Sequence, residues 1–393
     1  MRSSFSLLPM ITIIAISLTI TSFFSCTDNA IKYYNLGLDA VAKNDMDEAI
    51  EMWRKSLEYR PDDPETRYNI GLALLENELY AEAEKELSCA VSLKPDDHEA
   101  QYALGKSLEM QGKLVQAKAA YDRSTHLDPN YLPPLLGLAS CALKSGQNKS
   151  AENYAIRALN IDPRDLEGNL LLAEAYYRNS NYKAAHAQLL SARSISRKTP
   201  ELSLMLGKVT FSRRMYTDAL SALSSARQEG INNSELFLFL GLTYLAMNDI
   251  NKAEENFRIS IYKNENEIRA WQGLGKLYIK RQKWDKAFES FSKAKQIDPD
   301  NLEVDLGTSL VFLNSGKIEK AIELLEEIDK NSDAPPRTLY YLGHAYMRAN
   351  RKTDAKITFN RFIESWRGDQ VLTDEVNSLL ETLSTSGSIA PSE

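Results

Sequence analysis

The sequence predicts an all-α array of ten two-helix repeats, and three observations lead to this fold class. A small residue recurs every 34 residues, an alanine always follows it twelve residues later, and an apolar residue usually precedes it. A regular period of this length indicates stacked repeats rather than separate globular domains. The small residues are Gly37, Gly71, Gly105, Ala139, Ala173, Gly207, Gly241, Gly275, Ser309 and Gly343; the alanines are Ala49, Ala83, Ala117, Ala151, Ala185, Ala219, Ala253, Ala287, Ala321 and Ala355.

Each repeat is expected to be a pair of antiparallel helices that cross closely. In the eighth repeat, Gly275 on the first helix and Ala287 on the second would let the two backbones approach, because a long side chain would not fit there. Leu274, Tyr278 and Phe291 are expected to fill the surrounding space. Ala287→Leu should therefore disrupt the repeat by overpacking it.

The eighth repeat also resembles the tetratricopeptide repeat, through Trp271, Leu274, Gly275, Tyr278, Ala287, Phe291, Ala294 and Pro299. The resemblance covers residues 30–369 and implies a right-handed superhelical solenoid. In this family the first helix of each pair lines the inner face of the superhelix. Family members that act as chaperone adaptors hold a C-terminal carboxylate with a Lys and an Asn at set repeat positions. That pair is missing here, so the adaptor role is not implied.

The ends and joints of the array can also be read from the sequence. Residues 370–383 are expected to form a capping helix over the last repeat, and residues 384–393 a flexible tail. Several repeats lack the proline that marks the exit of the others, and in repeat nine Thr308 and Ser309 replace the usual Leu-Gly. We therefore expect any weak joint at repeat nine. The apolar face of the capping helix comprises Val371, Leu372, Val376, Leu379 and Leu380.

Composition and motifs exclude several classes of function. The formal charge of −7 is atypical of nucleic-acid binding, and 43% hydrophobic residues are typical of a folded protein. The four histidines fall at unrelated repeat positions, and neither a His-Glu-x-x-His nor a Cys-x-x-Cys motif occurs. We therefore expect no enzyme activity, no cofactor and no metal site.

The N-terminus resembles the signal peptide of a bacterial lipoprotein. Arg2 precedes an apolar run from Leu7 to Phe24, and the run ends in Ser-Phe-Phe-Ser-Cys at Cys26. The resemblance implies cleavage after residue 25 and a lipid on Cys26, with residues 26–29 as a short tether. The motif departs from the family pattern, because Phe23 stands where Leu is usual.

An uncleaved membrane anchor is the alternative, because the apolar run is just long enough to cross a bilayer. Either arrangement leaves the repeats outside the cytoplasm, in the cell envelope. In lipoproteins, Asp directly after the cysteine favours the inner membrane. Thr27 occupies that position here, which favours the outer membrane.

A binding groove is expected on the inner face, at repeat positions that the resemblance places there. The first three repeats present one tyrosine each, beside Leu38, Leu72 and Lys106, and such a lining suits an extended peptide or a partner helix. The alternative is that these side chains simply pack between neighbouring helices. The basic group of Arg269, Lys276 and Lys280 would hold an acidic segment or, alternatively, form an ordinary charged helix face. The groove candidates are Tyr34, Leu38, Tyr68, Leu72, Tyr102, Lys106, Arg269, Lys276, Lys280, Tyr340 and His344.

These features together predict a membrane-anchored scaffold or adaptor that binds protein or peptide partners in an envelope assembly. A small-ligand or transport-associated binding protein is the second hypothesis. It requires an enclosed cavity with convergent polar groups. The sequence does not indicate the partner or the oligomeric state.

Overall fold

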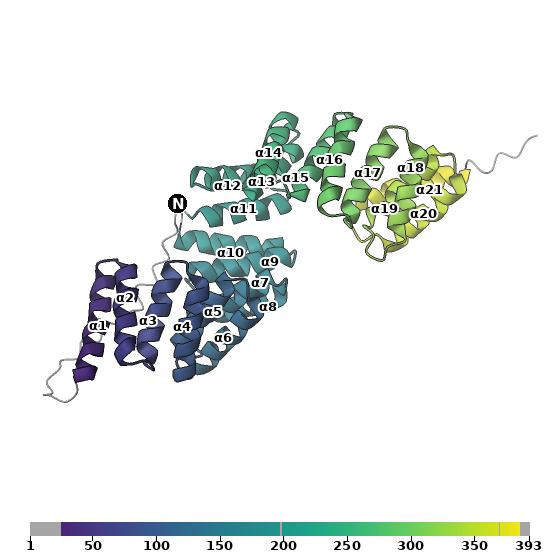
Figure 1. Ribbon diagram of the computed structural model, residues 1–393. Helices are drawn as coiled ribbons and strands as arrows, with labels where there is room; N and C mark the ends of the chain where they lie inside the picture. Colours follow the sequence, from purple (N-terminus) through teal and green to yellow (C-terminus); the bar gives the residue numbers. More distant parts are fainter. Residues whose placement is uncertain (1–24, 197–198, 369, 386–393) are drawn as a thin grey trace, which may run out of the picture. The chain divides into compact units, whose positions relative to one another are not determined.

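The computed structural model describes residues 25–196, 199–368 and 370–385, with side chains from Asn29 to Ser384 (Figure 1). All regular secondary structure in these ranges is α-helical. The predicted all-α repeat fold is confirmed: odd-numbered helices α1 to α19 are the first helices of the ten repeats, and even-numbered helices α2 to α20 are the second helices.

The chain divides into two compact units between residues 197 and 198. The division follows repeat five, one of the repeats that lack the exit proline. The helices of the first unit are α1 Ser25–Ala42, α2 Met46–Tyr59, α3 Pro64–Glu76, α4 Tyr80–Leu93, α5 His98–Met110, α6 Leu114–Leu127, α7 Leu132–Lys144, α8 Asn148–Ile161, α9 Leu166–Arg178 and α10 Tyr182–Ile195.

The helices of the second unit are α11 Pro200–Ser212, α12 Tyr216–Gln228, α13 Ser234–Ala246, α14 Ile250–Lys263, α15 Ile268–Lys280, α16 Trp284–Ile297, α17 Leu302–Asn314, α18 Ile318–Asp329, α19 Arg337–Arg348, α20 Lys352–Ser365 and α21 Gln370–Thr385. Repeat nine, α17 with α18, shares one hydrophobic core with repeat ten: Leu306, Leu325 and Phe359 belong to the same cluster. Repeat nine therefore packs continuously with repeat ten, and the division of the chain into units falls after repeat five rather than at repeat nine, where the sequence indicated a weak joint.

The first helices form a continuous surface within each unit. Contacts join α3 to α5, α5 to α7 and α7 to α9 in the first unit, and α11 to α13 and onward to α19 in the second. Each first helix also packs against its own second helix, and within each unit α3, α5, α7, α9, α13, α15, α17 and α19 pack against the second helix of the preceding repeat. On the side of the first helices that points away from the second helices, side chains of successive repeats therefore lie next to one another.

The recurring glycines make room for side chains rather than for a backbone crossing. A Cβ on Gly275 would lie 2.5 Å from the ring of Phe291, a residue of the second helix of the same repeat. Gly37, Gly105 and Gly343 face Trp53, Tyr121 and Phe359 in the same way. The sequence-based reason for these glycines, close backbone approach to the alanines, thus needs correction.

The recurring alanines are buried as expected. All ten members of the series, from Ala49 to Ala355, have 0% of their surface exposed. A larger side chain at any of them would meet close-packed neighbours on every side.

The turn within each repeat has a second periodic feature, which the sequence analysis missed. One residue per repeat has a positive φ, and seven of the ten are not glycine. L-amino acids other than Gly, Asn and Asp rarely adopt this left-handed conformation. The ten residues are Asn44, Glu78, Gly112, Gly146, Ser180, Arg214, Asn248, Gln282, Gly316 and Asn350.

The C-terminal helix α21 closes the core of the last repeat. Val376 is fully buried, and Leu372, Leu379, Leu380 and Leu383 pack against the same cluster. Val371 does not belong to this face, since 67% of its surface is exposed. Val371 lies in the first turn of α21, on its solvent side, so that part of the predicted apolar face is wrong.

Candidate binding surface

The first unit carries three tyrosines at the same repeat position on α1, α3 and α5. Tyr34, Tyr68 and Tyr102 are all half-buried. Tyr34 and Tyr68 pack against one core cluster, together with the half-buried Leu38 and Leu72. Each ring packs on its neighbours, as the packing interpretation expects, and also keeps a solvent-facing portion. The binding role of these tyrosines stays a prediction.

Polar contacts orient the first tyrosine. The Tyr34 hydroxyl accepts a hydrogen bond from Asn69 Nδ2 at 3.0 Å, which joins α1 to α3. The indole Nε1 of Trp53 donates to the Tyr34 carbonyl oxygen at 3.1 Å. Burial raises the pKa of the Tyr34 phenol, and Glu65 nearby raises it further. The ring thus presents a neutral hydroxyl at neutral pH.

The third tyrosine belongs to an aromatic group that sequence reasoning found only in part. The Tyr102 ring lies 5.6 Å from the ring of Tyr131 in an edge-to-face arrangement and 5.8 Å from that of Tyr121. His98 contacts Tyr131 edge-on at 4.8 Å. Tyr131 immediately precedes α7 and is not at a groove position of the repeat, so no periodic signal marked it. Burial raises the pKa of both Tyr102 and Tyr131.

A buried carboxylate ties repeats three and four together beneath this surface. Glu109 accepts hydrogen bonds from Tyr121 Oη at 2.7 Å, Ser140 Oγ at 2.7 Å and Lys144 Nζ at 2.8 Å. Burial alone would raise the pKa of Glu109, but the three donors outweigh it and the pKa is lowered. The half-buried Lys106 adds to this lowering. Because every donor belongs to the fold, we interpret Glu109 as structural.

The basic candidates of the second unit are only partly brought together. Lys276, on α15, is exposed, yet protein atoms surround its ammonium group enough to lower its pKa by desolvation. Glu303 opposes this lowering, while Arg337 and Arg269 add to it. Lys280 is exposed and is not among the groups that shift Lys276. Arg337 was missed by the sequence analysis, although it is at the same repeat position as Arg269.

The last two candidates lie against the capping helix. The Tyr340 hydroxyl donates to Glu375 Oε1 of α21 at 2.9 Å, and its ring contacts that of His344 at 4.5 Å. Burial lowers the pKa of His344, whose Nε2 lies 3.8 Å from the same Glu375 oxygen. We interpret this pair chiefly as part of the end cap.

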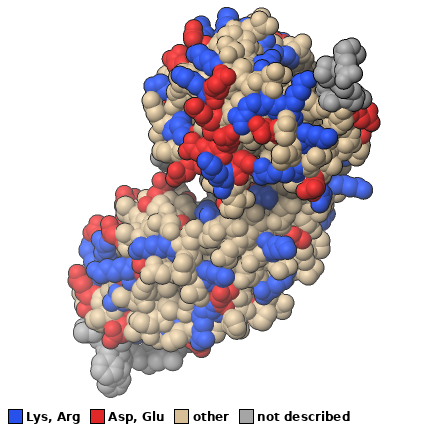
Figure 2. Space-filling view, turned by 90° about the vertical axis from the view of Figure 1, so that its right-hand side faces the viewer, with Lys and Arg blue, Asp and Glu red and all other residues tan. Residues whose placement is uncertain are grey.

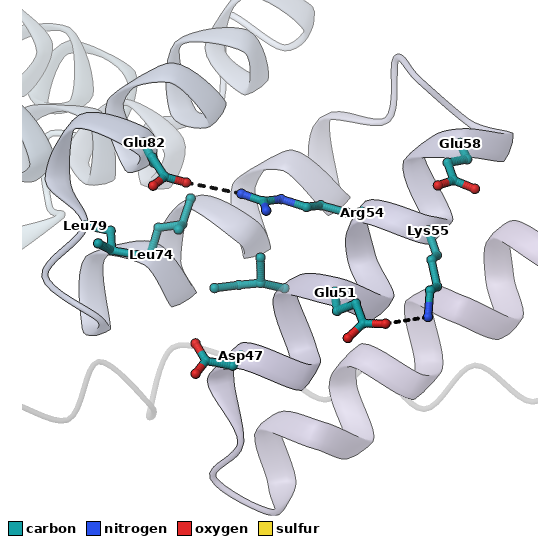
Figure 3. Close-up of a pocket in the computed structure, with 9 residues that line it drawn as sticks. Asp47, Glu51, Arg54, Lys55, Glu58, Leu74, Leu79 and Glu82 are labelled. Carbon is teal, nitrogen blue, oxygen red and sulfur yellow. Dashed lines mark hydrogen bonds and ion pairs between the residues drawn. The ribbon is translucent and has the colours of Figure 1, made fainter.

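Figure 3 draws a pocket lined mostly by residues of the second helices. It lies between α2 and α4, and four of its charged residues form two ion pairs: Arg54 with Glu82 at 3.2 Å, and Lys55 with Glu51 at 2.6 Å. The side chains of Arg54 and Glu82 are 55% and 57% exposed. Because these side chains are largely exposed, the pocket lacks the enclosure that the small-ligand hypothesis requires.

The anchor prediction falls largely outside the described residues. Residues 1–24 are not described, and of Cys26 only its place in α1 is given. Within the described ranges, no helix has both the length and the apolar character needed to cross a bilayer. In the same ranges, no group of three or more His, Cys, Asp and Glu side chains is arranged to hold a metal ion.

Taken together, the fold and these surfaces define an α-helical repeat protein of the kind that serves as a protein-interaction scaffold. Tetratricopeptide repeat models match residues 34–91 and 80–131, 108–165, 268–301 and 337–368. A model described as anaphase-promoting complex, cyclosome, subunit 3 matches residues 144–226. The chain is thus a tetratricopeptide-repeat protein.

Several solved structures are similar to this chain at low sequence identity. A tetratricopeptide repeat protein from Parabacteroides merdae is 16% identical with a TM-score of 0.52, covering 64% of this chain and 99% of that one. The Cut9 complex with Hcn1 from the APC/C is 11% identical with a TM-score of 0.50, over 91% and 97%. MamA protein is 23% identical with a TM-score of 0.41, over 44% and 93%. No curated protein sequence matches this chain.

Proposed function

We propose that this protein is a membrane-anchored scaffold of the cell envelope that binds an extended polypeptide segment of a partner on the first helices of its first unit. The observation that carries the proposal is the tyrosine series Tyr34, Tyr68 and Tyr102. These rings stand at one repeat position on three successive first helices, and each keeps a solvent-facing portion. A binding role without catalysis is what tetratricopeptide repeats generally provide.

Three physical features support an extended segment as the ligand. Tyrosine offers a large contact area at a low entropic cost and keeps one polar group for hydrogen bonding. The rings are already oriented, by Asn69 at Tyr34 and by Tyr131 at Tyr102, so little ordering remains to oppose binding. The repeat spacing also matches a ligand that runs along the array rather than into a pocket.

The anchoring part of the proposal rests on the N-terminal sequence. The apolar run from Leu7 to Phe24, followed by Cys26, favours lipidation, and retention of the run as an uncleaved anchor is the second candidate. Metabolic labelling with an alkyne palmitate in a bacterial host separates them. Lipidation predicts a labelled protein of reduced mass, with neither label nor cleavage in Cys26→Ala. A full-length, unlabelled wild-type protein in the membrane would instead support the uncleaved anchor.

Crosslinking in cells tests the binding surface. We expect the crosslinked partners of the wild-type protein to be lost when Tyr34, Tyr68 and Tyr102 are all replaced by alanine. Tyr262→Ala is the matched control, because that tyrosine is 84% exposed on α14 in the other unit. Thermal unfolding followed by circular dichroism shows whether the triple variant is folded. A folded triple variant with an unchanged set of partners would refute this surface.

A further inference from the structure

Three cations of the second unit lie on first helices that pack in succession: Arg269 and Lys276 on α15, and Arg337 on α19, with α17 in contact with both helices. The positive charges of Arg269 and Arg337 both help to lower the pKa of the Lys276 ammonium, which burial also lowers. Glu303 is the one carboxylate among its named influences. Arg269 and Arg337 are both exposed, and the Arg269 guanidinium lies 5.1 Å from the ring centroid of Phe239. We call Arg269, Lys276 and Arg337 the basic surface.

Local helix stability does not explain the two arginines. Arg269 and Arg337 lie in the first turns of α15 and α19, where the partial positive charge of the helix N-terminus disfavours a cation. Six other first helices have a glutamate at this repeat position, where it is favourable. These are Glu65, Glu99, Glu167, Glu201, Glu235 and Glu303. The face of the Phe239 ring offsets part of this cost for Arg269. A residue that breaks a local rule of helix stability is a candidate for function.

Ion pairing inside the protein does not explain the cations either. Lys208 and Glu235 hold the repeat positions equivalent to Lys276 and Glu303, two repeats earlier, and their charged atoms are 2.7 Å apart. Among the described residues, no ion pair within 4.0 Å joins Arg269, Lys276 or Arg337 to any carboxylate. The same two positions thus form an ion pair between repeats six and seven, but the equivalent Lys276 and Glu303 of repeats eight and nine form no ion pair within 4.0 Å.

We propose that the basic surface binds an acidic polypeptide segment of a partner, whose carboxylates supply the missing counter-charge. An Arg guanidinium binds a carboxylate through two parallel hydrogen bonds, and a Lys ammonium acts as a point charge. A polypeptide is the occupant we commit to, because tetratricopeptide repeats mediate protein interactions and α13, α15, α17 and α19 form one continuous surface.

This site is separate from the tyrosine series, which lies in the other unit, and does not depend on the proposed function. Figure 2 shows Lys and Arg interspersed with Asp and Glu on the face that it draws, so bulk charge segregation is not the basis of the proposal. The specific basis is three cations with one nearby carboxylate.

Fluorescence anisotropy with a labelled Glu-rich peptide tests the proposal on the purified protein. We expect binding that weakens as salt is added, and no binding of a Gln-rich peptide of equal length. Lys276→Met and Arg337→Gln should each weaken binding about three- to fivefold, as expected for partly exposed ion pairs. Lys283→Gln is the charge-matched control, because this exposed lysine lies in the turn before α16.

The remaining outcomes are also decisive. Equal binding of the Gln-rich peptide, or unchanged binding by folded Lys276→Met and Arg337→Gln proteins, would overturn the proposal. Displacement of the Glu-rich peptide by inorganic phosphate at concentrations where chloride of equal ionic strength has no effect would make this a phosphate site instead. The Tyr34, Tyr68 and Tyr102 triple variant should bind the Glu-rich peptide normally, which separates this site from the proposed function.

Discussion

The ring of Phe291 occupies the space that a side chain on Gly275 would need. A Cβ on Gly275 would lie 2.5 Å from Phe291 Cε2, and one on Gly307 of the next repeat would lie 2.2 Å from Cε1 of the same ring. Phe291 itself is fully buried. One aromatic side chain thus leaves room only for glycine at two positions, one in its own repeat and one in the following repeat.

Gly275→Ala should destabilise the second unit by about 1–3 kcal/mol, because the new methyl group forces the Phe291 ring to move within a close-packed core. The gain in helix propensity from Gly to Ala, about 1 kcal/mol, offsets part of this cost. Urea unfolding measures the net change. The compensating change Phe291→Leu should recover part of the loss, as in repeat five, where Ala173 accompanies Leu189. Independent, additive effects of the two substitutions would contradict this steric account.

The left-handed conformation of one residue in each turn predicts that adding a glycine there and removing one change the free energy of unfolding in different ways. Arg214→Gly should leave stability unchanged or raise it by up to about 1 kcal/mol, because glycine relieves the left-handed strain but loses more chain entropy on folding. Gly146→Ala should lower stability by about 1–2 kcal/mol, although nothing within 4 Å would meet its Cβ. Urea midpoints of the two variants distinguish backbone strain from packing, and a neutral Gly146→Ala would show that strain is absent.

Glu109 should make the stability of the first unit depend on acid pH. Its pKa is lowered in the folded state, so the charged form favours folding. This stabilisation is complete above the ordinary Glu pKa of 4.5 and is lost as the pH falls through the lower folded-state value. Glu109→Gln should cost about 1–3 kcal/mol at neutral pH, because it weakens three hydrogen bonds. Its unfolding midpoint should also vary less with acid pH than that of the wild type. Parallel pH profiles would argue against this assignment.

The capping helix provides a test with a matched pair of valines. Val376→Ala should destabilise the second unit by about 1–3 kcal/mol, because it leaves a cavity in the core of the last repeat. Val371→Ala should change stability by less than about 0.5 kcal/mol, because Val371 is mostly exposed. Thermal unfolding compares the two directly. Equal effects would mean that α21 does not dock as described.

Lys276→Met should stabilise the protein slightly while weakening acidic-peptide binding. A lowered pKa means that the folded state disfavours the ammonium form. The penalty is therefore complete at neutral pH and disappears only as the pH rises through the lowered folded-state pKa towards the ordinary value of 10.5. Because the side chain is exposed, we expect a gain below about 1 kcal/mol. The difference in melting temperature between the variant and wild type should shrink at alkaline pH. A destabilised variant would contradict this sign.

The inner-surface candidates show where sequence reasoning succeeds and where it stops. Tyr34, Tyr68 and Tyr102 were found because their role follows from repeat position alone. Tyr131 and Glu109 escaped notice because their importance arises from contacts with residues of other helices, which have no signature at a fixed spacing. Arg337 could have been found by comparing it with Arg269 at the equivalent position.

The sequence alone determined the repeat, its period, the second-helix alanines and the all-α fold, because a solenoid repeats one local packing problem and each solution leaves the same small residues at the same interval. Only the tertiary structure decided what each small residue faces, such as Phe291 at Gly275, and which part of α21 is buried. It also decided that the array divides after residue 197. The physical reason is that close packing limits the combined volume of two side chains that meet from different helices. Neither residue alone therefore indicates the contact, which becomes clear only when both helices are placed in space.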